Sequence, residues 1–284
     1  MKLKVVNNYL EVLKPRPSIL LTFIGTVAAI IAGEGHPPLD KLLLTLPAIL
    51  LLSAGANGLT NYLDRNIDAR MQRTKNRALP SKRIYPPEKA LALIIGLIII
   101  SLILAWQLHP LSFLSGVIGV IAASVWRKRS TCVFPQGALA SCTPALIGWF
   151  AIKPTFSWEL VLLCALIAVW LPIHVWSVMI ANREDYISAG LTFFPMSRKV
   201  REAVKVLVVF SMVLGVTSLA IYFVGDFTTF YLVTASLLSI LILSASARLV
   251  VSGTSNNAWK LYKLSAFPYL GLIFVAMFLD VWIM

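Results

Sequence analysis

The feature of the sequence that most constrains its fold is a series of long apolar runs separated by short polar stretches. These runs fall at about 17–33, 42–63, 91–108, 111–126, 134–152, 158–180, 203–224, 228–247 and 265–283. A helix needs about 20 mostly apolar residues to cross a bilayer, and 58% of this chain is hydrophobic whereas only 13% is charged. The sequence therefore predicts an all-α, polytopic membrane bundle of about nine transmembrane helices, and it excludes a water-soluble globule or a disordered chain.

The apolar runs follow one another without a soluble insert, so we expect a single transmembrane domain over residues 1–284. Residues 1–16 lack the apolar core and the cleavage site of a signal peptide, and no transit peptide is visible. These features favour a prokaryotic plasma membrane over the membrane of an organelle.

Lysine and arginine are distributed unevenly between the runs. If the N-terminus is cytoplasmic and nine spans alternate, all of the 25 Lys and Arg residues except Lys41 and Lys153 fall on the cytoplasmic side. This asymmetry follows the positive-inside rule and predicts that the C-terminus lies outside. The net charge of +13 then indicates contact with a membrane surface and anionic substrates, and not with nucleic acid.

Four polar residues recur at intervals of about one helical turn at the end of the second run. They are Asn57, Asn61, Asp64 and Asp68, separated by 4, 3 and 4 residues, so they share one helical face. Hard oxygen ligands in this pattern suit Mg²⁺, which takes one or two carboxylates and substrate phosphates. The alternative is a helix that ends in water, with its Asp residues paired to Arg65 or Arg70.

A basic cluster that includes Arg73, Lys75 and Arg77 follows within ten residues of the carboxylates, and Arg127 and Lys128 form another basic group. Basic side chains disfavour a plain cation site but favour a metal–diphosphate site, in which Mg²⁺ bridges carboxylates and phosphate while Arg and Lys hold the remaining oxygens. A simple positive-inside anchor would explain the basic residues but not the Asp pair.

A second polar connection, which contains Asp185, follows the sixth apolar run. If one helix continues from His174 to Asp185, both residues share a face and lie roughly 16 Å apart. Acidic residues on two cytoplasmic loops would allow Mg²⁺ to bridge a diphosphate from two sides. A histidine inside an apolar span is a functional candidate, and the alternative is a structural, hydrogen-bonded His174.

The stretch from Asn61 to Arg77 resembles the first signature of the UbiA superfamily of intramembrane prenyltransferases. Its Met71-x-Arg-Thr-Lys-Asn-Arg77 tail resembles the branch that farnesylates protoheme IX. The same branch is suggested by Lys14-Pro15-Arg16, the basic residues 127–129 before Pro144-Ala-Leu-Ile-Gly148-Trp149, His174-Val-Trp176, Asp185-Tyr186-x-x-Ala189-Gly190 and Pro195-Met196. The chain departs from the family at Thr60 and Asn66, where Asn and Asp are usual, at Ala78, where Pro is common, and in the segment 191–194.

The resemblance implies transfer of a farnesyl group from farnesyl diphosphate to a vinyl group of haem b, giving haem O and diphosphate. It implies that Asn61, Asp64, Asp68 and Asp185 hold Mg²⁺, with the three Asp residues catalytic. Candidates for the diphosphate are Arg73, Lys75, Arg77, Arg127 and Lys128. His174 and Trp176 are candidates for contact with haem, which is a substrate here and not a cofactor. Further implied partners are the lipid bilayer and downstream haem-modifying or oxidase-assembly proteins.

Two other functions remain open. A relative within the superfamily would prenylate a quinone precursor or another lipid acceptor, and His174 and Trp176 argue against it. A transporter would need ionisable groups near the membrane midplane or interrupted half-helices in repeats. The carboxylates gather instead near one membrane face, which favours the enzyme.

Overall fold

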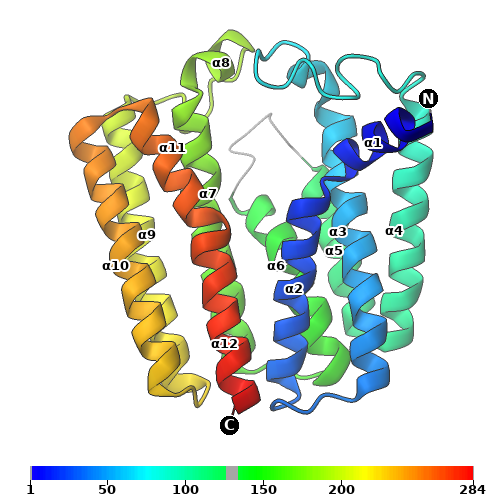
Figure 1. Cartoon of the computed structure of the whole chain (residues 1–284), viewed down its shortest axis with the longest axis vertical. Coiled ribbons are helices and arrows are strands. Elements are labelled where there is room, and N and C mark those ends of the chain that lie inside the picture. Colours follow the sequence, from blue (N-terminus) through cyan, green and yellow to red (C-terminus); the bar gives the residue numbers. More distant parts are fainter. Residues whose placement is uncertain (1, 126–133, 284) are drawn as a thin grey trace.

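The computed structural model describes residues 2–125 and 134–283, and every regular element in these two ranges is a helix (Figure 1). The predicted all-α class is therefore confirmed. Seven helical segments in the described ranges are long and apolar enough to cross a membrane. They are α2 (Pro15–Ala32), α3 (Leu39–Asp68), α4 (Glu88–Leu108), α7 (Trp158–Ala181), α9 (Val200–Val224), α10 (Thr229–Ser252) and the segment Ser255–Trp282.

Two shorter apolar helices occupy the fourth and fifth predicted spans. They are α5 (Pro110–Ser124), with 15 residues, and α6 (Gln136–Ile152), with 17 residues. At 1.5 Å per residue they reach about 22 and 25 Å, which is less than the roughly 30 Å of a hydrocarbon core. The two helices flank residues 126–133, which lie outside the described ranges. The count of nine crossings thus stays a prediction.

The last span differs from its predicted boundaries. The sequence places it at 265–283, but helical structure begins at Ser255 with α11 (Ser255–Leu264) and continues through η1 (Ser265–Gly271) into α12 (Leu272–Ile283). Ala266 has a non-helical ψ of −128°, and Pro268 lies inside the same turn. Because proline has no backbone N–H to donate, the hydrogen-bond ladder is interrupted here and the span is kinked.

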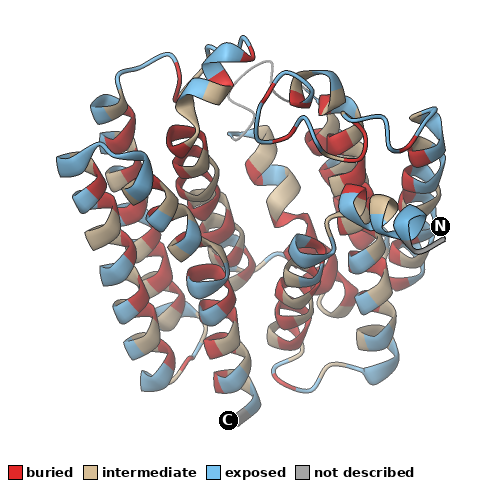
Figure 2. Ribbon diagram, turned by 45° about the horizontal axis from the view of Figure 1, so that its top comes forward, coloured by how far each residue is buried: buried red, intermediate tan, exposed pale blue. Residues whose placement is uncertain are grey.

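The helices form two groups that face each other (Figure 1). In one group α3 packs on α4 and α5, while α6 packs on α2 and α5; in the other, α9 packs on α7 and α10. Helix α6 also contacts α7, which joins the two groups. Buried residues line the inward faces of both groups, whereas exposed residues cover the outside (Figure 2). A long apolar helix with exposed apolar side chains on its outer face is what a lipid environment requires.

Small residues allow the close approach of α2 and α6. A Cβ atom built on Gly148 would collide with the carbonyl oxygen of Gly25, and one built on Gly25 would collide with the carbonyl oxygen of Pro144. Glycine at these positions lets the two backbones pack directly, as is common between membrane helices.

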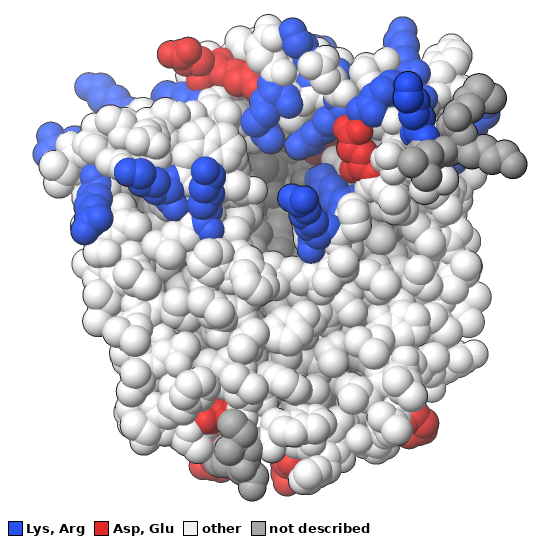
Figure 3. Space-filling view, in the orientation of Figure 1, with Lys and Arg blue, Asp and Glu red and all other residues white. Residues whose placement is uncertain are grey.

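One end of the bundle carries most of the basic side chains (Figure 3). We call it the basic end. It comprises α1 (Lys2–Leu13), the α3–α4 connection at 69–87, and the α7–α9 connection with the short helix α8 (Arg183–Ser188). The end of α12 lies at the opposite end of the bundle from α1 (Figure 1).

Candidate functional site

The polar face predicted at the end of the second run is present on α3. This helix continues without a break to Asp68, and the side chains of Asn61, Asp64 and Asp68 are all buried. The Asn61 amide nitrogen donates a hydrogen bond of 2.7 Å to the carbonyl of Val12 in α1. With its nitrogen engaged, Asn61 has its amide oxygen to offer to a ligand. Asn61, Asp64 and Asp68 thus share a buried side of α3, as their spacing predicts, and Asn57 is half-buried and donates to Ser18 Oγ at 3.2 Å.

Asp68 is paired with a basic residue from the following loop. Arg77 Nη1 lies 3.2 Å from Asp68 Oδ2, and Thr74 Oγ1 donates to the Asp68 carbonyl at 2.9 Å. Arg65, which the sequence offered as a partner, donates instead to the carbonyl of Tyr62 at 2.7 Å and covers its ring. The loop 69–87 therefore folds back over the end of α3.

The remaining cations of this loop face outward. Arg73 and Lys75 are exposed, and Arg73 Nη2 donates to the hydroxyl of Tyr186 in α8 at 3.3 Å. Arg127 and Lys128, the other two predicted diphosphate residues, lie outside the described ranges. Of the three predicted diphosphate cations that the structure describes, Arg77 contacts a buried carboxylate, whereas Arg73 and Lys75 are exposed on the loop.

The α3–α4 loop is anchored by residues that no sequence motif indicated. Arg83 donates to Asn8 Oδ1 at 2.6 Å and to Glu11 Oε2 at 2.5 Å, both in α1. Glu11 also accepts a hydrogen bond of 3.1 Å from the backbone N–H of Ala78. The available sequence signal for this anchoring role was Glu11, the single acidic residue in the basic segment 1–16.

The expected helix from His174 through Asp185 is interrupted, which corrects the shared-face geometry. Helix α7 ends at Ala181, Asn182 has φ −118° and ψ 33°, and α8 starts at Arg183. Asp185 therefore turns toward the α3–α4 connection. Its Oδ1 accepts from the backbone N–H of Gln72 at 2.6 Å, and its Oδ2 accepts from the backbone N–H of Arg73 at 3.2 Å.

Asp185 thus joins the two polar connections, as predicted in outline, but through backbone groups. Within residues 2–125 and 134–283 no set of three or more His, Cys, Asp or Glu side chains is close enough to hold one metal ion. The structure brings Asp64 and Asp68 together with Asn61 and leaves Asp185 with the loop.

His174 and Trp176 lie in other surroundings. The His174 ring is stacked between Trp170 and Tyr262, with centroid distances of 4.8 and 4.6 Å, and its Nδ1 lies 3.1 Å from Ser265 Oγ. Trp176 packs against Phe194 and Phe210, and its buried Nε1 has no hydrogen-bond partner in the described part of the chain. The contacts of His174 join α7 to the kinked last span.

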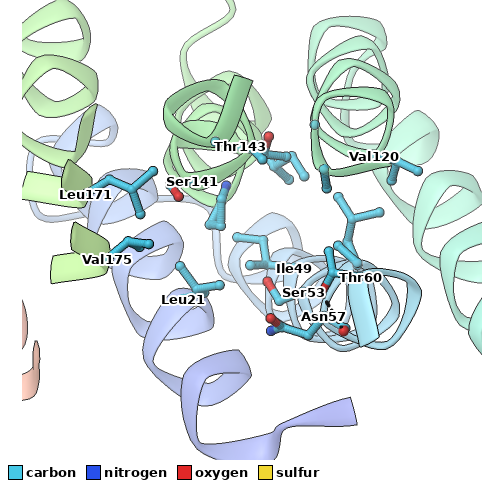
Figure 4. A pocket seen from close by; sticks show the side chains of 18 residues that line it. Leu21, Ile49, Ser53, Asn57, Thr60, Val120, Ser141, Thr143, Leu171 and Val175 are labelled. Atoms are coloured by element: carbon cyan, nitrogen blue, oxygen red, sulfur yellow. Dashed lines mark hydrogen bonds between the residues drawn. The ribbon is translucent and has the colours of Figure 1, made fainter. Parts of the chain in front are cut away.

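A largely apolar cavity of about 210 Å³ lies beside the polar face of α3, among α2, α3, α5, α6 and α7 (Figure 4). Asn57 and Thr60 line it one to two turns before Asp64. Its apolar lining includes Leu21, Ile49, Val120, Leu171 and Val175, and its other polar lining includes Ser53, Ser141 and Thr143. His174 and Trp176 are not among the lining residues. The polar pair Ser141 and Thr143 within an apolar run was the sequence signal for this cavity.

The candidate site combines charged groups at the end of α3 with an apolar cavity. Buried carboxylates, an amide and basic side chains occupy the basic end, and a largely apolar cavity lies deeper along the same helix, where Asn57 and Thr60 line it. This combination suits an amphiphile whose anionic head binds at the end of α3 and whose apolar tail enters the cavity.

Comparison with known proteins supports this assignment. The model of the UbiA prenyltransferase family matches residues 19–277. The protoheme IX farnesyltransferase of Desulforudis audaxviator is 37% identical, with 97% of this chain and 88% of that protein covered. The protein of the same name from Symbiobacterium thermophilum is 32% identical, with 98% and 95% covered.

Solved structures share the fold. A UbiA homologue from Archaeoglobus fulgidus bound to GPP and Mg²⁺ superposes with a TM-score of 0.65 at 18% identity, and 98% of this chain and all of that chain are covered. A digeranylgeranylglyceryl phosphate synthase superposes with a TM-score of 0.80 at 19% identity, with 98% and 99% covered.

Proposed function

Because this chain belongs to the UbiA prenyltransferase family, we propose that it transfers a farnesyl group from farnesyl diphosphate to a vinyl group of protoheme IX. The products are haem O and diphosphate. The observation that carries this proposal is the juxtaposition of the buried Asn61, Asp64 and Asp68 with an apolar cavity lined by Asn57 and Thr60. The choice of haem b as acceptor is supported by the names of the relatives that cover nearly the whole chain.

The donor set fits Mg²⁺. Two buried carboxylates one helical turn apart repel each other, and a divalent cation between them offsets that repulsion. We assign Asn61, Asp64 and Asp68 to this ion. Asp185 joins this set only if it releases the backbone N–H groups of Gln72 and Arg73.

Basic residues receive the diphosphate. Arg73, Lys75 and Arg77 lie on the loop that covers the end of α3, and Arg77 already contacts Asp68. We propose Arg127 and Lys128 as further contacts, on the sequence pattern alone. Together with Mg²⁺, which neutralises charge on the leaving group, these side chains favour ionisation of an allylic diphosphate.

The reaction then needs a dry chamber. Cleavage of the carbon–oxygen bond leaves its electron pair on the diphosphate and a cation on the allylic carbon. A haem vinyl carbon attacks this cation and forms the new carbon–carbon bond, and water adds to the resulting cation with loss of a proton. The apolar walls of the cavity limit premature attack by water.

We retain His174 and Trp176 as candidate haem contacts on the basis of the resemblance. Neither residue lines the cavity, and the faces of the His174 ring are stacked between Trp170 and Tyr262. A role for downstream haem-modifying or oxidase-assembly proteins follows from the expected product alone.

The decisive experiment uses the purified full chain with haem b, farnesyl diphosphate and Mg²⁺, followed by mass analysis of the haem. We expect a farnesylated, hydrated haem and release of diphosphate, and we expect both to stop with excess EDTA. An aromatic acid offered as a competing acceptor tests the alternative quinone-precursor activity. Prenylation of that acid with unmodified haem would overturn the proposed acceptor, and full turnover in EDTA would overturn the metal assignment.

A further inference from the structure

A second cavity lies at the basic end, apart from the one described above. It measures about 220 Å³ and is lined by the last turns of α3 and by the loop that leads into α4, including Arg65, Asn66, Leu79, Pro80, Lys82 and Tyr85. It shares no lining residue with the central cavity. Asn66 is exposed and Arg65 half-buried, whereas Asp64 and Asp68 on the opposite face of the same helix are buried.

The lining carries positive charge and hydrogen-bond donors. It contains the cations of Arg65 and Lys82 and the amide of Asn66, and none of its lining residues is Asp or Glu. The Arg65 guanidinium is held in place, since Nη1 donates to the Tyr62 carbonyl at 2.7 Å and the group lies 4.1 Å from the centre of the Tyr62 ring. A guanidinium has five N–H donors, so a fixed one presents the remaining donors in a defined geometry.

The turn that carries Lys82 is also held in place. Lys82 has a φ of 58°, in the left-handed region that residues with a Cβ atom rarely adopt, and its N–H donates to the Leu79 carbonyl at 3.1 Å. The next residue, Arg83, is bonded to Asn8 and Glu11 of α1. Contacts within the protein therefore hold both the Arg65 guanidinium and the backbone turn of Lys82 in place before any ligand binds.

The position of the cavity selects an amphiphilic ligand. It lies where α3 ends and α4 begins, and both helices are candidate membrane spans. Leu79 and Pro80 supply an apolar wall, and Tyr85 is 69% exposed beside them. Aromatic residues gather at the level of lipid headgroups, and basic residues at this level attract anionic lipids.

We propose that this cavity binds the phosphate of an anionic phospholipid, with Arg65, Lys82 and Asn66 as its contacts and the acyl chains beside the outer faces of α3 and α4. The same phosphate chemistry would accept free phosphate, but the apolar wall and the place at the helix ends favour the lipid. Binding of a lipid at this cavity is independent of the acceptor of the prenyl group.

The test compares the full chain in nanodiscs of phosphatidylcholine alone with nanodiscs that also contain phosphatidylglycerol. We expect phosphatidylglycerol to raise the midpoint of thermal unfolding and to be retained in native mass spectra. The double variant Arg65→Gln/Lys82→Gln should lose this response, with a weakening of roughly fivefold in lipid affinity for each cation removed. Lys260→Gln is the matched control, because Lys260 is an exposed cation on α11, in the other helix group.

A second pair of variants covers the case in which the double variant does not fold. Asn66→Asp places a negative charge in the cavity and should abolish the response, whereas the neutral Asn66→Gln should retain it. Equal responses from all variants would show a general charge effect and overturn the proposal. An equal rise in midpoint from inorganic phosphate in phosphatidylcholine nanodiscs would also overturn it, in favour of a free-phosphate site.

Discussion

At the scale of single residues, the side of a helix decides the role. Asp64 and Asp68 face the bundle interior at the end of α3, while Arg65 and Asn66, their neighbours in sequence, line an outer cavity. Asn66 replaces the Asp that is usual in the family, and its exposed position keeps this change away from the buried carboxylates. We therefore expect the two faces to respond differently to substitution.

The substitution Asp64→Asn tests the inner face. It keeps the shape of the side chain but removes a charge, so we expect turnover to fall by at least about 10²-fold, the scale for loss of one preorganised electrostatic contact. Asn66→Asp, measured in neutral detergent, is the control and should retain turnover. Near-normal turnover of a folded Asp64→Asn protein would remove Asp64 from the site.

The substitution His174→Ala tests the stack on α7. Because the His174 ring fills the space between Trp170 and Tyr262, we expect a lower unfolding midpoint. The proposed haem contact adds weaker haem binding and a shifted haem absorption band, with prenyl diphosphate binding unchanged. An aromatic pair typically contributes about 0.5–1.5 kcal/mol beyond its buried area. Similar losses in binding of both substrates, with an unchanged haem absorption band, would instead give His174 a structural role alone.

At the scale of elements, the two polar connections and α1 are tied together by a few contacts. Asp185 in α8 binds the backbone of the α3–α4 loop, and Arg83 of that loop binds α1. Within the bundle, α2 and α6 approach closely because Gly25 and Gly148 lack side chains. These contacts fix where the basic loop lies relative to the end of α3.

The substitution Asp185→Ala should loosen the loop. Loss of the acceptors for Gln72 and Arg73 frees the segment that carries the diphosphate cations, so we expect a rise of roughly tenfold in KM for farnesyl diphosphate, the scale of one lost hydrogen bond to a charged group. The Mg²⁺ concentration for half-maximal activity should stay unchanged. A higher Mg²⁺ requirement in the variant would instead support direct ligation of the metal by Asp185. Glu184→Ala, at an exposed neighbouring position, is the control.

The substitution Gly148→Val should disrupt the α2–α6 contact. Its side chain would collide with the Gly25 carbonyl, and overpacking of this kind costs about 1–3 kcal/mol or more. We expect a clearly lower unfolding midpoint in detergent. Gly96→Ala is the control, because nothing lies within 4 Å of a Cβ built at Gly96. Equal midpoints for both variants would show that α2 and α6 are not in close contact.

At the scale of the whole molecule, the basic side chains and the candidate site lie at the same end of the bundle. Lys and Arg residues gather at one end of the bundle, and several acidic residues lie at the other (Figure 3). The two polar connections that form the candidate site are at the basic end. The positive-inside rule predicts that this site and the proposed lipid-phosphate cavity lie at the cytoplasmic surface.

Thiol labelling of intact cells tests this orientation. Ser197→Cys lies in the α7–α9 connection and Thr155→Cys in the α6–α7 connection, and both positions are exposed. We expect a membrane-impermeant thiol reagent to label Thr155→Cys and to leave Ser197→Cys unlabelled until the cells are opened. The unsubstituted protein measures background from its native cysteines. The reverse pattern would invert the predicted topology.

The sequence alone determined the helical class, the membrane environment and the inner face of α3. Apolar runs and the 4, 3, 4 spacing of Asn57, Asn61, Asp64 and Asp68 are local patterns, and helical geometry translates such patterns directly into a shared face. The signature from Asn61 to Arg77 likewise indicated the family before any contact was known.

Only the tertiary structure decided which segments meet across the chain. The break at Asn182, the turn of Asp185 toward Gln72 and Arg73, and the stack on His174 depend on packing between segments about 90 to 110 residues apart. The two cavities also arise between elements: Thr143 of α6 and Thr60 of α3 line one, and Lys82 of the loop and Arg65 of α3 line the other. Periodicity along one helix carries no information about such contacts, because they are fixed by how the helices and loops pack together.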